Sequence, residues 1–150
     1  AGREFPIVKE CIDKVYGAMK GNISFTRVGS VYWSRGFVYA LVDHEAILTA
    51  QKKFGVKVLT GEEFRWGMEN LNITAERIKE MGAEGLLQPL SNSCADHEGG
   101  GTVFIQEWDG EKWVNTGEVF TPMEDFVRGL IEESAAKYAK EKEITPRDCK

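Results

Sequence analysis

The stretch SNSCADHEGGGTVFIQEWDGEKW, residues 91–113, holds a cluster of reactive side chains and the clearest strand signal in the chain. Residues 102–108 are rich in β-branched and aromatic side chains, which favour β-strands. Asp109 and Gly110 follow as a two-residue turn, because both tolerate a positive φ. Residues 111–115 then return as the partner strand, so the stretch predicts a β-hairpin.

The residues just before this hairpin admit two chemical interpretations. As an enzyme, the chain would use Cys94 as a nucleophile and His97 as its base, but the sequence shows no third group that would orient them. As a metal site, it would use Asp96, His97 and Glu98 with Cys94 as a further ligand. No second ligand pair at metal-site spacing stands elsewhere in the sequence.

A structural loop is the third interpretation of this cluster, and we favour it. The polar side chains would bond loop amides, and the glycines at 99–101 would lead the backbone into the strand. Cys94 could then form a disulfide with Cys149, closing a loop of about 55 residues and stabilising the fold by about 4 kcal/mol. Cys11 would remain a buried free thiol.

Length and charge exclude several classes of protein. The chain has 150 residues and a net charge of −5, without a long basic run. A nucleic-acid partner is therefore not expected, because a basic face is needed to displace counterions from phosphates. No apolar stretch is long enough to span a bilayer, and the N-terminus lacks a signal pattern, so membrane insertion is not expected either.

Helical spacing of apolar residues predicts a helix-rich chain with few strands. Capping boxes at Thr60 and Thr121 mark two helix starts. A short extended segment is predicted at 85–90. The expected helices cover residues 6–19, residue 33 or 34 to 54, 60–71, 74–82 and 121–140. Too few strands remain for a doubly wound parallel sheet, so the domain is either α+β or has a sheet completed by residues outside this chain.

The residues at the start of the second helix are candidates for a binding site. Tyr32 and Trp33 stand where free amides and the positive end of the helix dipole favour a carboxylate. Ser34 could donate a hydrogen bond, and Arg35 could assist with an anion. The alternative is that both aromatic residues belong to the core and that Arg35 is solvated.

Four segments, in order along the chain, resemble one known family. They are residues 60–72, 93–99, 105–113 and 135–149. They resemble periplasmic substrate-binding proteins of ABC transporters of the branched-chain amino acid type (hydrophobic amino acids and amides), which have the type I periplasmic-binding fold.

The resemblance implies an α/β fold and a chain that matches only the carboxyl-terminal portion of such proteins. Residues 1–92 would be second-lobe helices and a strand, 93–120 a hinge-proximal loop and β-hairpin, and 121–150 the C-terminal helix and tail. The chain would then be helix-rich as a fragment, because the first lobe is missing.

The resemblance also implies a function, which is non-catalytic capture of a small solute for delivery to an ABC importer. The solute would be an amino acid, an amide or an aromatic acid, bound through Tyr32, Trp33, Ser34 and Arg35. The expected partners are this ligand, the missing N-terminal portion and the permease of the intact protein. The expected location is the periplasm, or the cell exterior with attachment through the transporter, and no cofactor is expected.

Two alternatives to solute capture follow from the residues themselves. One is a small hydrolase or metal-dependent enzyme built on Cys94, Asp96 and His97. The other is an autonomous protein-interaction domain whose apolar face is the partner surface.

Overall fold

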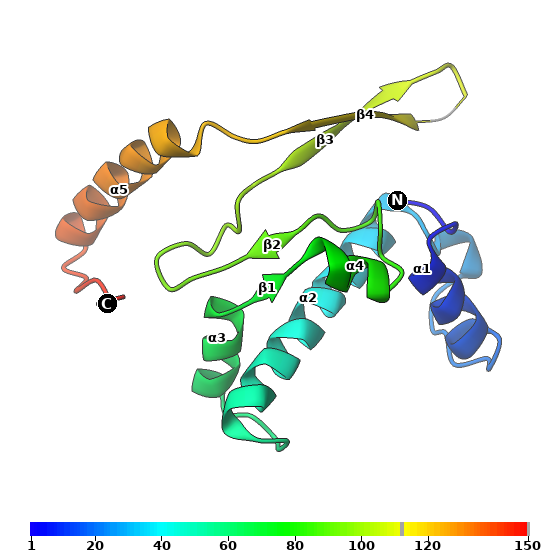
Figure 1. The fold of residues 1–150 in the computed structure, drawn as a ribbon, viewed down its shortest axis with the longest axis horizontal. Helices are drawn as coiled ribbons and strands as arrows, with labels where there is room; N and C mark the ends of the chain where they lie inside the picture. Colours follow the sequence, from blue (N-terminus) through cyan, green and yellow to red (C-terminus); the bar gives the residue numbers. More distant parts are fainter. Residues whose placement is uncertain (112, 150) are drawn as a thin grey trace. The chain divides into compact units, whose positions relative to one another are not determined.

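The computed structural model describes residues 1–111 and 113–149. The chain divides into two compact units, residues 1–97 and residues 98–150. The described residues form an α/β structure with five α-helices and two small antiparallel sheets of two strands each (Figure 1). The expected α/β class and the richness in helix are therefore confirmed, while the division at residues 92 and 120 stays a prediction.

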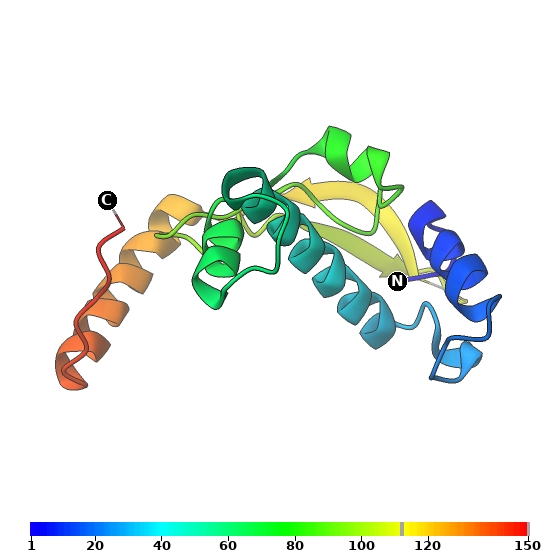
Figure 2. The same cartoon turned by 90° about the horizontal axis from the view of Figure 1, so that it is seen from below.

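The first unit packs short elements along one long helix, which Figure 2 shows from below. Strand β1 pairs antiparallel with β2, so that Ile73 lies opposite Leu90. The elements in chain order are α1 (Pro6–Cys11), the π-helical turn η1 (Ile12–Tyr16), the 3-10 turn η2 (Phe25–Arg27), α2 (Val31–Phe54), α3 (Gly61–Glu69), β1 (Asn72–Ile73), α4 (Ala75–Glu80) and β2 (Leu90–Ser91).

The N-caps explain where the helices of this unit begin. At the start of α3, the Glu63 amide donates to Thr60 Oγ1 at 3.2 Å, and the Thr60 amide donates to Glu63 Oε2 at 2.9 Å. The predicted capping box is confirmed, because both reciprocal bonds are present. Thr74 caps α4 with a single bond, in which the Arg77 amide donates to Thr74 Oγ1 at 3.2 Å.

Three boundaries in this unit differ from the predictions. Helix α2 begins at Val31, two or three residues early, because Ser30 is already extended and serves as its N-cap. The first helix changes to π-helical hydrogen bonding at Ile12, so only its first six residues are α-helical. The predicted extended segment contributes only its last residue, Leu90, to β2.

The second unit consists of the hairpin β3 (Val103–Trp108) and β4 (Trp113–Phe120), followed by α5 (Glu124–Glu141). The hairpin is confirmed, but the two-residue turn is wrong. Trp108 pairs with Trp113, so positions 109–112 lie between the strands, and residue 112 is outside the described residues. The Glu111 amide donates to Asp109 Oδ1 at 2.8 Å, an Asx-type turn that bends the chain without ladder bonds.

The capping box predicted at Thr121 is also wrong. Helix α5 begins at Glu124 with Met123 as its N-cap, and no side chain caps it. Pro122 gives the physical reason, since a proline pushes the residue before it toward extended backbone but does not make that residue a cap. Glu124 and Asp125 in the first turn still favour the helix dipole.

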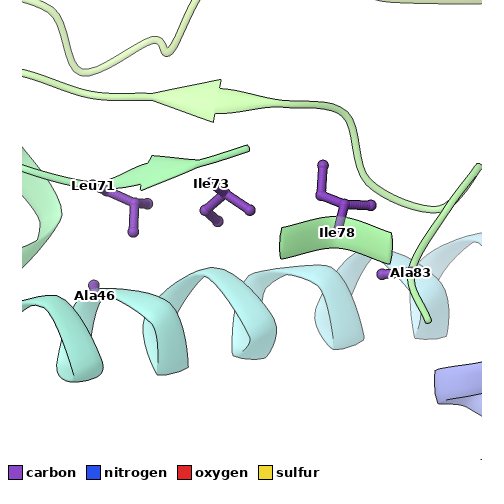
Figure 3. Packing of buried hydrophobic residues seen from close by; sticks show 5 residues of the cluster. All are labelled: Ala46, Leu71, Ile73, Ile78 and Ala83. Carbon is purple, nitrogen blue, oxygen red and sulfur yellow. The ribbon is translucent and has the colours of Figure 1, made fainter. Parts of the chain in front are cut away.

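The core of the first unit lies where β1, α4 and the segment just after α4, at Ala83, cover α2. Leu71 and Ile73 are its largest fully buried side chains, at 1% exposure each. Figure 3 shows the five buried members of this core, which are Ala46, Leu71, Ile73, Ile78 and Ala83. Burial of these groups is the main stabilising term for the first unit.

Helices α2 and α3 cross closely at a buried glycine. A Cβ atom at Gly67 would overlap the carbonyl oxygen of Ala46 and would lie 3.0 Å from the Cβ of Ala50. Only the missing side chain lets the two backbones approach this closely. The crossing holds α3 in place, and α3 carries most of the pocket described below.

A bidentate ion pair joins α2 to α4. Arg77 donates to Glu45 through Nε at 2.9 Å and through Nη2 at 2.8 Å. Glu45 is 8% exposed. The hydrogen bonds from Arg77 lower the pKa of the Glu45 carboxyl below its ordinary value, against the opposing effect of burial.

The second unit leaves its apolar side chains uncovered. None of the described residues at 101–111 and 113–149 is buried. The exposed large apolar side chains of the hairpin and α5 are Val103, Ile105, Trp108, Trp113, Val114, Val119, Phe120, Phe126, Val127, Leu130 and Tyr138. Such a surface is typical of an interface, because monomeric proteins rarely expose contiguous apolar areas of this kind.

Candidate functional site

The four residues predicted to bind ligand lie together in the first turn of α2, but they do not face one way. Tyr32 is 84% exposed, whereas Ser34 is 4% exposed. Successive residues of an α-helix differ by about 100° in direction, so these two side chains leave opposite sides of the helix. The first turn of α2 therefore presents these side chains in different directions.

Two of the four already have partners on α2 itself. Trp33 stacks on Phe37 with ring centroids 4.9 Å apart and planes 12° apart. Arg35 donates from Nε to the Tyr39 hydroxyl at 2.9 Å. Both contacts follow from the i, i+4 spacing, which brings these side chains together on the helix surface. A ligand would have to use the faces of these groups that remain open.

Ser34 differs from the other three. Its Oγ atom is buried and has no hydrogen-bond partner among the described residues. An unsatisfied buried hydroxyl costs free energy, so such a group is commonly satisfied by something outside the chain. The ligand-binding role of Tyr32, Trp33, Ser34 and Arg35 stays a prediction.

The reactive-looking cluster at 94–98 is arranged as a turn. The Ser93 amide donates to the Asp96 carbonyl at 2.8 Å, and the Asp96 amide donates to Ser93 Oγ at 3.0 Å. The Nε2 atom of His97 lies 3.5 Å from Oε1 of Glu69. Within residues 1–111 and 113–149, no three His, Cys, Asp or Glu side chains are grouped as metal ligands would be.

Helix α3 and the turn at 92–97 line an open pocket within the first unit. Its volume is about 310 Å³, at the lower end of the range for small-molecule sites. The i, i+4 spacing on α3 places two apolar and two charged side chains along one wall. The lining residues are Phe64, Arg65, Met68, Glu69, Asn92 and His97.

The charges of this pocket are unevenly placed. The Glu69 side chain is 11% exposed and lies 3.9 Å from Arg65 Nε and 3.5 Å from His97 Nε2. The side chains of Arg65 and His97 are 55% and 65% exposed. The carboxylate is thus held at the pocket wall, while the cationic and imidazole groups stand at the mouth.

Sequence reasoning missed this pocket. Its apolar wall, Phe64 and Met68, was visible as an i, i+4 pair in the helix that Thr60 opens, but such pairs usually belong to the core. Both residues do pack against the core from its edge. The pocket appears only because residues 92–97 return to the outer edge of this helix.

The cysteines provide a test of the predicted pairing. Cys11 is a free thiol on α1, and partial burial raises the pKa of that thiol. The predicted disulfide between Cys94 and Cys149 stays a prediction.

Titration of the denatured, non-reduced chain is expected to find one reactive thiol, and three after reduction. Three thiols before reduction would remove the disulfide.

One solved structure matches the whole chain closely. It is described as the crystal structure of an ABC transporter permease from the Pseudomonas fluorescens group. The match has a TM-score of 0.92 and 46% sequence identity, and it covers 100% of this chain and 36% of that chain. This chain therefore spans about a third of the matching protein. Comparison with protein-family models gave no match, and comparison with curated proteins gave none.

This match corrects the protein class that the sequence segments suggested. The matching protein is described as a permease, and not as a periplasmic substrate-binding protein. Capture of a solute for delivery to an importer, and a location as a free periplasmic binding protein, are therefore contradicted. The wider expectation of a relation to ABC transporters agrees with the match.

Proposed function

We propose that the chain is part of an ABC transporter component and that it acts without catalysis, by packing against other parts of that transporter. The observation that supports this most is the 46% identity over the whole chain to a protein described as an ABC transporter permease. At this level of identity and a TM-score of 0.92, the two share their fold throughout the matched region. Its location would then be that of a membrane-bound transporter complex.

Among the helices built from described residues, none combines the length and the hydropathy that a bilayer crossing demands.

The exposed apolar residues of the second unit support a packing role. Trp108 and Trp113 form a pair with ring centroids 5.6 Å apart, yet they remain 51% and 63% exposed. On α5, Phe126 is 66% exposed. An isolated two-stranded hairpin is only marginally stable in water, so it needs a surface to cover it. We propose that another component of the transporter covers this surface.

An affinity experiment on membranes tests the proposal. The gene segment for this chain would be tagged in place, and the tagged product would be purified from detergent-solubilised membranes after mild crosslinking. We expect the ATP-binding subunit of a transporter to be recovered with it, at a near-stoichiometric ratio by mass spectrometry. Recovery of the product from the soluble fraction with no ATP-binding subunit would overturn the proposal.

A hairpin variant makes the same experiment specific. Trp108→Ser combined with Trp113→Ser removes most of the exposed aromatic surface and should reduce recovery of the partner. Tyr39→Ser is a matched control, because Tyr39 is an equally exposed aromatic residue, at 57%, on α2. Equal recovery in both variants would exclude the hairpin as the packing surface.

A further inference from the structure

We propose that the pocket between α3 and the turn at 92–97 binds a neutral, flat nitrogen heterocycle that carries an amino group. The amino group donates to Asn92 Oδ1 and to the Glu69 carboxylate. The pocket has the volume of a small-molecule site, about 310 Å³, and Phe64 and Met68 form its apolar wall. The proposal goes beyond the transporter role proposed above and does not depend on it.

Asn92 provides the observation on which the proposal rests. Its side chain lines the pocket, and its Oδ1 atom is buried with no hydrogen-bond partner among the described residues. The main chain holds this residue in place, because the Asn92 amide donates to the Leu71 carbonyl at 2.9 Å. A buried acceptor without a donor costs free energy, so such an atom is commonly satisfied by a group outside the chain. A ligand that offers an N–H group to Asn92 Oδ1 would remove this cost.

Glu69 adds a second acceptor to the same pocket. Its side chain lines the pocket and is 11% exposed. An ionised carboxylate can only accept hydrogen bonds, and the amide oxygen of Asn92 is likewise an acceptor. An amino group has two N–H donors, one for each of these residues, whereas an anionic group has no donor for either. The buried polar atoms of the pocket therefore select a donor.

The charges at the pocket favour a neutral ligand. Arg65 Nε lies 3.9 Å from Glu69 Oε1, so these two opposite charges offset each other. An anionic ligand would meet a like charge at Glu69, and a ligand ammonium group would meet a like charge at Arg65. The Arg65 side chain is 55% exposed and its guanidinium is a donor only, so a ring nitrogen with a lone pair could accept from it at the pocket mouth.

The apolar wall determines the body of the ligand. Phe64 and Met68 project from consecutive turns of α3 and are half-buried, so each presents part of its side chain to the pocket. A thioether beside an aromatic ring is an adaptable apolar surface that makes favourable contacts with a second ring. A flat ring would fill this space and release water from both side chains.

The test compares two probes of the same shape. 2-Aminopyrimidine and 2-methylpyrimidine are both uncharged at neutral pH and keep the same ring nitrogens, so they differ only in the amino donors. Each would be titrated into the ¹⁵N-labelled chain. We expect 2-aminopyrimidine to change the chemical shifts of residues 64–69 and 92–97, and 2-methylpyrimidine to bind about tenfold more weakly. Equal affinity for both probes, shift changes elsewhere only, or no binding of 2-aminopyrimidine would overturn the proposal.

Two variants of the chain separate the role of the buried acceptor from a general change in polarity. Asn92→Leu removes the acceptor at a similar side-chain size and should weaken 2-aminopyrimidine binding about tenfold, without changing the affinity for 2-methylpyrimidine. Asn22→Leu makes the same substitution at an exposed position between η1 and η2 and should have no effect. An equal loss in both variants, or no loss in Asn92→Leu, would contradict the site. If the Asn92 variant does not fold, the comparison of the two probes on the unmodified chain still decides the proposal.

Discussion

Replacement of Gly67 by alanine is expected to lower the free energy of unfolding by about 2 to 3 kcal/mol, as overpacking of a close contact does. Intrinsic propensity acts in the opposite direction, since alanine is favoured over glycine by about 1 kcal/mol within a helix. The steric term is larger here, because the new Cβ would overlap the backbone oxygen of Ala46. Backbone cannot rotate away as a flexible side chain can, so α2 and α3 must separate.

Gly36, within the long helix α2, provides the control. A Cβ at Gly36 would meet no atom within 4 Å, so Gly36→Ala should leave stability unchanged or raise it by up to about 1 kcal/mol. Urea denaturation followed by circular dichroism measures both variants. Equal stability of the Gly67 variant and the unmodified chain would show that the two helices do not cross as described.

Removal of Arg77 is expected to have an effect of similar size. Arg77→Ala leaves the carboxylate of Glu45, which is 8% exposed, without its bidentate partner. Breaking a buried ion pair costs about 3 to 5 kcal/mol. We expect about 2 to 3 kcal/mol here, because the Arg77 side chain is 35% exposed and part of the pair is screened by water.

Two further variants identify the cause of this loss. Lys79→Ala removes an exposed cation from the same helix and should change stability by less than about 0.5 kcal/mol. Glu45→Gln in the Arg77→Ala background should recover part of the lost stability, since it removes the unpaired charge. No recovery would mean that the loss comes from packing of the arginine stem.

The same ion pair predicts a dependence of stability on pH. The pKa of the Glu45 carboxyl is lowered in the folded chain, so its contribution is complete above the ordinary glutamate pKa of about 4.3. That contribution is lost as the pH falls through the lowered folded-state value. The unmodified chain should therefore lose more stability than Arg77→Ala between about pH 5 and pH 3. Parallel slopes for the two proteins would contradict the coupling.

Local signals in the sequence predicted those parts of the fold that depend on neighbouring residues. The capping box at Thr60 needs only the residues within one turn, and the structure contains it. The same pattern at Thr121 failed, because a pattern of residue types does not fix which residue becomes the cap. The hairpin strands were found from composition, but their register depends on pairing across the turn, which composition does not specify.

The candidate pocket could not be predicted because its two walls come from separate segments. In the sequence, the residues of α3 indicate an amphipathic helix, and residues 92–97 indicate a loop with reactive side chains. Only the folded chain brings His97 to within 3.5 Å of Glu69. That contact gives the histidine a neighbour that neither the nucleophile nor the metal interpretation had included.

The protein class was the least predictable feature. Matching segments indicated a relation to ABC transporters, but they named the wrong component of the system. Short segments record common ancestry and packing, whereas the role of a component depends on the chains around it. The matching permease has most of its length outside the match, so the segments within this chain carry little information about that role.

The most direct measurement is the molar ratio of a transporter's ATP-binding subunit to the tagged chain after purification from solubilised membranes. A place within an ABC transporter component predicts a ratio near unity that falls when Trp108 and Trp113 are both replaced by serine. A tagged chain found in the soluble fraction, with no ATP-binding subunit beside it, would contradict that place.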